Sequence, residues 1–200
     1  MERNKGAILQ ALRRILDDAP SHLTDDVREL SLLELGSGTG EHAVHFARTL
    51  KQWRYYPSDV SHDALRSINA HAAEAGLSNL TPAQHIDLST SDWNVTPMHA
   101  AFCANVIHIS PPAVTEGLIS GVGRCLVSGG PFLLYGPFSF EGVLRPESNV
   151  RFDEWLKSRD PSFGVRAKEE VADIAEAHRL QLEEVLPMPA NNHCLVFRKQ

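Results

Sequence analysis

The stretch Leu32-Leu33-Glu34-Leu35-Gly36-Ser37-Gly38-Thr39-Gly40 decides how this chain folds. Its apolar beginning is typical of a buried strand, and the three alternating glycines predict a sharp turn into a helix that begins near Glu41. Glycine is needed where the backbone takes a positive φ or lies directly against a ligand. The stretch therefore predicts a strand, a ligand-facing turn and a helix in succession.

The spacing of these glycines departs from the dinucleotide-binding pattern G-x-G-x-x-G. The third glycine arrives one residue early, and Glu41 occupies the position that the pattern fills with a small residue. Glu34, two residues before the first glycine, can face an ammonium group and would repel a pyrophosphate. An E-x-G-x-G-x-G sequence after a strand resembles motif I of the class I S-adenosylmethionine (SAM)-dependent methyltransferases.

The composition fits one globular domain, because 200 residues with an apolar fraction of 42% suffice for a sizeable core. A net charge of −6 gives no electrostatic reason to bind nucleic acid or an anionic membrane. The cysteines are odd in number and widely spaced, which argues against a disulfide framework or a zinc site. No apolar run is long enough to cross a bilayer, and the N-terminus has no signal-peptide core. We therefore expect a cytoplasmic protein with one domain over residues 1–200, and a homodimer is compatible with these observations.

Hydrophobic periodicity and turn residues predict an alternation of helices and strands. Apolar residues at helical spacing from Ile8 to Leu16 predict a first helix that ends near Pro20. Gly76 is a normal residue just after the end of a helix. Further helices are expected at 41–50, 61–75, 113–126 and 168–180, and strands at 32–35, 53–59, 80–86, 100–106, 132–135, 181–186 and 194–198.

This alternation predicts an α/β fold with a mostly parallel sheet, because strands joined by helices run in the same direction. The last two strands are joined by the short segment 187–193, which suits an antiparallel pair. Together with the resemblance to motif I, the pattern implies a Rossmann-like class I methyltransferase fold. Its sheet would have seven strands, mostly parallel, with an antiparallel last strand and helices on both faces.

The alternation breaks over about residues 136–165, a stretch rich in Pro, Gly, Ser and aromatic residues. Connections that long in a compact domain are usually lids, binding elements or insertions. The aromatic residues of this stretch either exclude water above a compact organic acceptor or close the hydrophobic core, and the sequence leaves both readings open. These residues are Phe138, Phe140, Trp155 and Phe163.

Three acids fall at the ends of successive predicted strands: Glu34, Asp59 and Asp87. In doubly wound sheets, ligands bind beyond the carboxyl ends of the strands at the point where the strand order reverses. Glu34 is placed to accept from the methionyl ammonium directly or through water, Asp59 to take both ribose hydroxyls, and Asp87 to accept from the adenine amine. A single acid at a strand end equally often caps the next helix, so only the three acids together favour a cofactor site.

Further motifs follow one another along the chain: Arg3-Asn4-Lys5, S-G-T-G-E-H-A-V-H-F-A from Ser37, P-S-D from Pro57, F-C-A-N-V-I-H-I-S-P from Phe102, L-Y-G-P-F from Leu134, and M-P-A-N-N-H from Met188. In this order they resemble, nearly end to end, the DUF938 family of methyltransferase-like proteins. The resemblance implies a class I methyltransferase fold with SAM as cofactor and S-adenosylhomocysteine as product. It does not identify the acceptor.

The end of the fourth predicted strand carries the candidate catalytic residues Asn105 and His108, and Tyr135 ends the fifth strand. Asn105 can orient a polar group of substrate or cofactor. His108 is a candidate general base because imidazole titrates near neutral pH. The alternative for His108 is a hydrogen-bonded core histidine, and for Tyr135 it is simple packing.

Residues expected to contact the cofactor are Asn4, Glu34, Gly36, Ser37, Gly38, Gly40, His42, Asp59, Asp87, Leu88 and Asn105. The segment Arg3–Lys5 precedes the first predicted helix and either folds over the cofactor carboxylate or is a disordered polar terminus. His42 and His45 have a spacing that metals use, but they lack a third nearby ligand, so we expect no metal. The polar cluster 191–193 either borders the acceptor pocket or reflects turn chemistry alone.

The sequence thus favours a SAM-dependent methyltransferase that acts on a small molecule. Acid balance and chain length favour a small molecule over nucleic acid and leave a protein acceptor open. Two alternatives keep the cofactor. One is a different use of SAM, by aminocarboxypropyl transfer or cyclisation of SAM itself, and the other is a catalytically silent SAM-binding protein.

Overall fold

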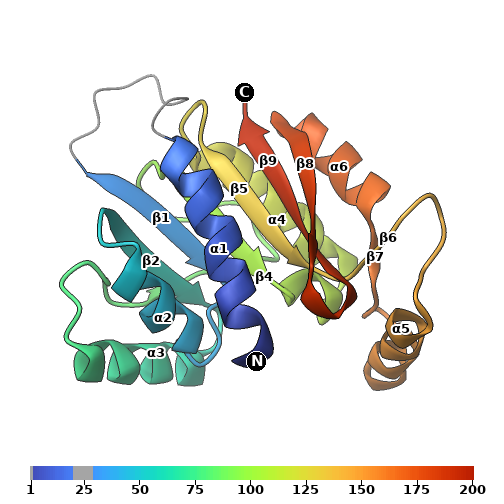
Figure 1. Ribbon diagram of the computed structural model, residues 1–200, viewed down its shortest axis with the longest axis horizontal. Helices are drawn as coiled ribbons and strands as arrows, with labels where there is room; N and C mark the ends of the chain where they lie inside the picture. Colours follow the sequence, from blue (N-terminus) through green and yellow to red (C-terminus); the bar gives the residue numbers. More distant parts are fainter. Residues whose placement is uncertain (1, 20–28) are drawn as a thin grey trace.

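A seven-stranded sheet runs through the centre of the molecule, with the strand order β3-β2-β1-β4-β5-β9-β8 (Figure 1). The computed structural model describes residues 2–19 and 29–200. Three helices cover one face of the sheet, namely α1 (Glu2–Asp18), α2 (Glu41–Thr49) and α3 (His62–Ala75). The other face is covered by α4 (Pro112–Cys125) and α6 (Lys168–Ala177).

The strand directions confirm the predicted α/β fold. Five neighbouring strands are parallel: β1 (Leu30–Leu35), β2 (Trp53–Asp59), β3 (Gln84–His85), β4 (Ala100–Ala104) and β5 (Pro131–Gly136). The last strand, β9 (Asn192–Lys199), is antiparallel to both of its neighbours, β5 and β8 (Leu180–Met188). A separate two-stranded sheet joins β6 (Phe138–Ser139) to β7 (Arg166–Ala167).

Alternate residues of the central strands supply the two halves of the core. Leu32 and Phe102 face α1 and α2, whereas Leu33 and Cys103 face α4. All four are fully buried, and burying a leucine side chain contributes about 1.5–3 kcal/mol to stability. Central parallel strands are apolar on both faces because helices cover both sides.

The strand order reverses between β1 and β4, which are neighbours in the sheet although they are not consecutive in the chain. The connections that leave their carboxyl ends depart toward opposite faces, and a crevice opens between them in folds of this type. Here the glycine loop 36–40 follows β1 and the turn 105–110 follows β4. The first turn of α1 lies near the same edge of the sheet (Figure 1).

The structure corrects three predicted boundaries. Helix α1 already begins at Glu2, so Arg3–Lys5 form its first turn instead of preceding it, and Pro20 lies outside the described residues. The strand predicted at 80–86 is reduced to two residues and one bridge at Leu80, since Pro82 has no N–H for the ladder. β4 ends at Ala104 because Asn105 adopts a left-handed φ of 63°.

The segment 136–165, predicted as a lid or insertion without regular structure, contains the helix α5 (Glu147–Arg159). Its first turn is fastened to the 3-10 turn η3 (Pro189–Asn191): Asn149 Nδ2 donates to the Asn191 carbonyl over 3.0 Å, and Asn191 Nδ2 donates to Ser148 Oγ over 3.1 Å. The sequence pattern missed this helix because its apolar residues do not form one continuous stripe.

Candidate functional site

The glycine loop contains two glycines required by packing and one that faces open space. All three have positive φ, at 71° for Gly36, 57° for Gly38 and 87° for Gly40. A Cβ atom on Gly36 would lie 2.4 Å from Val106 Cγ2, and one on Gly40 would lie 2.8 Å from Ile68 Cα. A Cβ atom on Gly38 would meet no described atom within 4 Å. Gly38 is therefore the position at which a ligand can approach the loop.

Two carboxylates hold this loop. Ser37 Oγ donates to Glu34 Oε2 over 2.9 Å, and the Gly38 N–H donates to Asp59 Oδ2 over 2.9 Å. The other oxygen of Asp59 accepts from the Ser61 N–H, also at 2.9 Å. Each carboxylate oxygen has lone pairs left for a further donor. The ends of β1 and β2 thus place two acids beside the loop, as the sequence predicted.

Glu34 lies underneath the loop, with 2% of its surface exposed. Burial, together with the charge of Asp59, raises the pKa of its carboxyl to about 7, against the hydrogen bond from Ser37. This placement suits contact with an ammonium group through Ser37 or a water molecule better than direct contact. Glu34 therefore combines two tasks, since it fixes the loop and supplies a titratable charge behind it.

Asp87 and Leu88 differ in what they can offer a ligand. Asp87 is exposed, and its Oδ1 accepts from the Ser89 N–H and hydroxyl at 2.8 and 2.7 Å, which lowers its pKa. The Ile86 N–H donates to the Asp59 carbonyl over 3.1 Å, so Asp59 and Asp87 lie at the same edge of the sheet. The Leu88 side chain is buried in the core that faces α4, so only its backbone is left for a cofactor contact, which stays a prediction.

Asn105 and His108 lie on the short turn that follows β4, which includes the 3-10 turn η2 (Val106–His108). Asn105 is exposed just beyond the carboxyl end of β4. His108 is 1% exposed and packs edge-on against Phe138, with 5.2 Å between ring centroids. Neither ring nitrogen has a hydrogen-bond partner in the described chain. Burial, together with the charge of Arg166, lowers the pKa of His108 to about 3, so the imidazole is uncharged at neutral pH.

Tyr135 lies on the other face of the sheet. It belongs to the core that α1 and α2 cover, whereas His108 packs on Phe138 of the core that α4 covers. Burial raises the pKa of Tyr135 to about 12, opposed by the nearby Asn4 side chain of α1. The structure therefore does not bring the side chains of Tyr135 and His108 together, although Tyr135 lies near the end of β5 and His108 on the turn that follows the neighbouring strand β4.

Both histidines of α2 pack against the Phe46 ring. His42 stacks on Phe46 at 5.3 Å between ring centroids, and burial lowers its pKa. His45 meets the same ring edge-on at 5.6 Å. Within residues 2–19 and 29–200, no group of three His, Cys, Asp or Glu side chains is placed to hold a metal ion.

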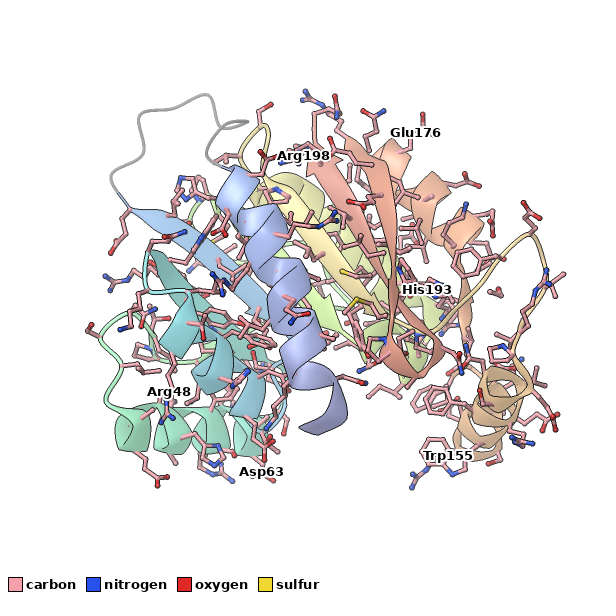
Figure 2. The ribbon with its side chains drawn as sticks, in the orientation of Figure 1. Arg48, Asp63, Trp155, Glu176, His193 and Arg198 are labelled. Atoms are coloured by element: carbon pink, nitrogen blue, oxygen red, sulfur yellow. The ribbon has the colours of Figure 1, made fainter. Side chains whose placement is uncertain are left out.

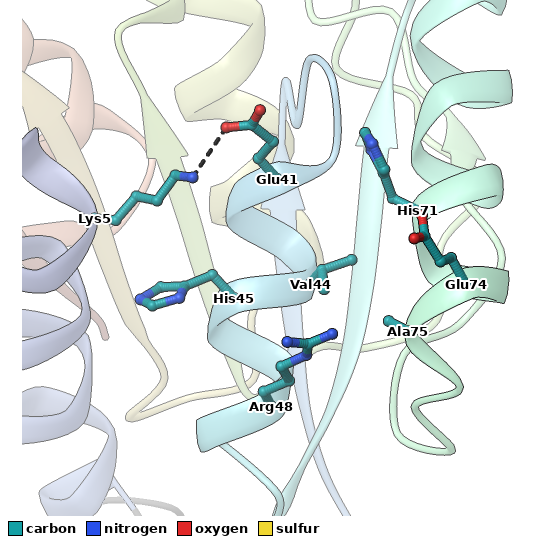
Figure 3. A pocket seen from close by; sticks show the side chains of 8 residues that line it. All are labelled: Lys5, Glu41, Val44, His45, Arg48, His71, Glu74 and Ala75. Atoms are coloured by element: carbon teal, nitrogen blue, oxygen red, sulfur yellow. Dashed lines mark ion pairs between the residues drawn. The ribbon is translucent and has the colours of Figure 1, made fainter. Parts of the chain in front are cut away.

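A cavity of about 370 Å³ lies beside α2 and is separate from the crevice (Figure 3). Lys5 of α1 forms an ion pair with Glu41 across its upper end, with 3.0 Å between Nζ and Oε2. All of its lining residues come from α1, α2 and α3: Lys5, Glu41, Val44, His45, Arg48, His71, Glu74 and Ala75. The cavity therefore does not contain any residue of the glycine loop or of the turn after β4.

The aromatic residues of segment 136–165 do not form one cluster. Phe138 is buried against His108, and Phe140 meets His193 at 4.6 Å between ring centroids. Trp155 is 49% exposed and projects from the far side of α5, where it stacks on Phe152 (Figure 2). The predicted role of the segment as a lid stays a prediction.

Arg166 is a site residue that the sequence analysis missed. It comes from β7, yet its guanidinium donates to the carbonyls of Ile107 and Ser110 on either side of His108, at 3.0 and 2.6 Å. No local motif marks this arginine, because its partners lie 59 and 56 residues away in the chain. Only the fold brings them together.

The model of a protein family described as "Protein of unknown function (DUF938)" matches residues 1–199. This chain belongs to the DUF938 family. The resemblance drawn from the motifs is thereby confirmed. Among the described residues of this DUF938 chain, no helix is long and apolar enough to span a membrane.

Solved structures similar to this DUF938 chain include three proteins at low sequence identity. An O-methyltransferase family 2 protein from Planctomyces limnophilus DSM 3776, in complex with apigenin, is 17% identical, with a TM-score of 0.76 over 98% of this chain and 62% of that one. The mitomycin 7-O-methyltransferase MmcR is 12% identical, with a TM-score of 0.73 over 95% and 54%. LepI in complex with SAM is 15% identical, with a TM-score of 0.75 over 92% and 46%.

These matches show that the DUF938 chain has the Rossmann-like fold of SAM-dependent methyltransferases. The chain spans between about half and three fifths of the length of these proteins, from 46% to 62%. The activities and ligands named above are properties of those three proteins.

Proposed function

We propose that this chain binds SAM in the crevice between β1 and β4 and transfers its methyl group to a small-molecule acceptor, with S-adenosylhomocysteine as product. The observation that carries the proposal is the glycine loop held by Glu34 and Asp59. Two carboxylates beside a helix N-terminus suit the positively charged sulfonium and ammonium groups of SAM. They disfavour the pyrophosphate that this kind of loop otherwise binds.

Other residues at the carboxyl edge of the sheet are suited to bind the ribose and the adenine of SAM. Gly38 leaves open space on the loop, and Asp59 keeps lone pairs for the ribose hydroxyls. Asp87 has a second carboxylate oxygen for the adenine amine, and the exposed Asn105 amide can orient either substrate. Asn4 lies on the first turn of α1, and its Oδ1 is buried without a hydrogen-bond partner. When bound, SAM supplies an electrophilic methyl group.

His108 is the proposed general base. The imidazole is uncharged and neither ring nitrogen has a hydrogen-bond partner among the described residues, so both keep hydrogen-bonding capacity. Both nitrogens are buried, so this role requires the residues packed around the ring to move when an acceptor binds. Its enclosure by Phe138 and the segment that follows α5 keeps water away. The similar structures support a small organic acceptor, since one of them was solved with apigenin. The 136–165 segment is proposed as the wall of the acceptor pocket.

Calorimetry tests the cofactor, and product analysis tests the reaction. We expect SAM and S-adenosylhomocysteine to bind at least tenfold more tightly than NAD, which is about 1.4 kcal/mol or more. Incubation with SAM and a metabolite extract should yield S-adenosylhomocysteine. Methylthioadenosine instead would show aminocarboxypropyl transfer or cyclisation of SAM, and SAM binding without either product would show a silent binding protein. Tighter binding of NAD would overturn the proposed function.

Two alanine variants separate binding from folding in the glycine loop. Gly38→Ala should weaken SAM binding roughly tenfold, because its new methyl group occupies the open space, while the added strain in the free protein stays near 1 kcal/mol. Gly40→Ala should lower the free energy of unfolding by about 2 kcal/mol, because its methyl group meets the α3 backbone at Ile68. Calorimetry and urea titration of both variants check this contrast. Equal affinities for SAM in wild type and Gly38→Ala would place the cofactor elsewhere.

A further inference from the structure

Arg166 gathers three carbonyl groups around the turn that carries His108. Its Nε donates to the Ile107 carbonyl over 3.0 Å, and one terminal nitrogen donates to the carbonyls of Ser110 and Ser162 over 2.6 and 2.9 Å. The guanidinium thus spans the turn from the residue before His108 to the second residue after it. A planar fork of donors with fixed directions is what holds several carbonyls at once.

The same segment ties the turn to α5. The Gly164 N–H donates to the His108 carbonyl over 3.0 Å. The next residue, Val165, donates its N–H to Asp153 Oδ1 of α5 over 2.8 Å. Asp153 is 8% exposed, and its second oxygen accepts from Lys157 Nζ over 2.6 Å. Residues 164–166 therefore form a continuous connection between α5 and the His108 turn.

We propose that Arg166 is a positioning residue for His108: its guanidinium holds the turn in the conformation that keeps the imidazole packed between Phe138 and Gly136. The proposal rests on the proposed function in one respect, namely that His108 is the base. The contacts themselves are backbone contacts on both sides of His108, so they fix where its Cα lies without engaging its ring.

The charge of Arg166 has a second effect on the imidazole. Apart from burial, the groups that act on the pKa of His108 are the Arg166 guanidinium and the Gly164 backbone, and no carboxylate is among them. The acids near Arg166 are Asp153 of α5 and Glu170 of α6, and they favour its own charged form. Arg166 therefore opposes protonation of His108 and keeps it an acceptor.

The test compares Arg166→Met, Arg166→Lys and the control Arg159→Met. Arg159 lies over the exposed Trp155 ring at 4.9 Å, and among the described residues no hydrogen bond joins it to the His108 turn, so its loss removes a charge and one ring contact away from that turn. The primary readout is the NMR titration of the His108 ring in the free protein, which needs no acceptor. Hydrogen exchange of the Gly164 amide reports whether the turn has loosened, and kcat with S-adenosylhomocysteine as product is the second readout.

In Arg166→Met we expect the His108 pKa to rise, and the Gly164 amide to exchange faster than in wild type. Arg166→Lys keeps the positive charge but loses the forked donors of the guanidinium. The Gly164 amide should therefore exchange faster than in wild type, while the His108 pKa changes little. Both variants should lower kcat about tenfold with the KM for SAM unchanged. Arg159→Met should match wild type throughout.

The outcomes separate this proposal from the proposed function. If wild type makes no methylated product but the His108 titration still shifts in Arg166→Met, the methyltransferase assignment fails and the link between Arg166 and His108 stands. If the variants fold with wild-type titration, exchange and kcat, Arg166 does not position His108. A fall in melting temperature alone, with those three readouts unchanged, would equally reduce Arg166 to a structural role. If Arg166→Met does not fold, Arg166→Lys decides by its exchange and kcat.

Discussion

His108→Ala should lower the rate of methyl transfer by about tenfold and leave the affinity for SAM within twofold, a smaller loss than the ~10²–10⁴-fold typical of a base whose pKa lies near the working pH. A pKa of about 3 makes the imidazole a weak base, and among the described residues no hydrogen bond joins His108 to the glycine loop that is proposed to hold SAM. With a His108 pKa of about 3, the imidazole is uncharged at every pH above about 4. The rate in wild type should therefore show no step from His108 between about pH 5 and 8, and the loss in the variant should shrink at high pH as the acceptor hydroxyl ionises on its own.

The measurement is kcat with a hydroxyl acceptor from the product analysis, at several pH values, together with calorimetry of SAM. Tyr135→Phe is the matched control, because it removes a buried hydroxyl that lies on the other face of the sheet and has no hydrogen-bond partner in the described chain. We expect it to keep kcat within threefold. Added imidazole should restore part of the rate in His108→Ala, since the deleted ring leaves a cavity of its own shape. Full turnover in His108→Ala across the pH range would remove the base role.

The sequence predicted the architecture because the information is local. Strands such as Leu30–Leu35 and Ala100–Ala104 are short apolar runs bounded by turn residues, and each helix between them has an apolar face. Predictions failed where one residue overrode the pattern, as Pro82 did by interrupting a strand and Asn105 by ending one. The helix α5 was missed because its position depends on hydrogen bonds to residues outside the helix. Asn149 donates to the Asn191 carbonyl of η3, and Asp153 accepts from the Val165 N–H.

The residues of the candidate site also fall into two groups, those that local sequence patterns predict and those that only the fold reveals. Glu34, Gly38 and Asp59 were predictable because strand ends and glycine loops mark the carboxyl edge of a parallel sheet. Two properties of the site depend on tertiary packing, which the spacing of residues in the sequence does not reveal. These are the raised pKa of the buried Glu34 and the uncharged state of His108 beneath Phe138. Arg166 shows the limit most clearly, because its three carbonyl partners are backbone groups that carry no sequence signal.

Glu34→Gln should make the protein more stable at high pH while it weakens SAM binding. Burial raises the pKa of Glu34 from 4.5 to about 7, so the folded protein holds a proton that the unfolded chain releases. Its contribution to stability is therefore full below about pH 4.5 and is lost as the pH rises to about 7. The neutral amide has no such loss. Relative to wild type, the variant should gain about 3 kcal/mol in free energy of unfolding between pH 4.5 and pH 8.

The affinity for SAM should change in the opposite direction. An ionised Glu34 behind the loop attracts the cationic cofactor, so wild-type binding should strengthen between about pH 6 and 8, and Glu34→Gln should lack this dependence. Urea titrations and calorimetry at both pH values measure the two effects. Glu41→Gln is the control: Glu41 is an exposed carboxylate at the same helix start, its pKa is lowered by Lys5, and its removal should give no gain in stability with rising pH. A folded Glu34→Gln that binds SAM as wild type does at pH 8 would mean that Glu34 only packs the loop. If Glu34→Gln is more stable and binds SAM more weakly, the ionised Glu34 carboxylate serves ligand binding. Such a buried charge destabilises the free protein, and the cofactor needs it for binding.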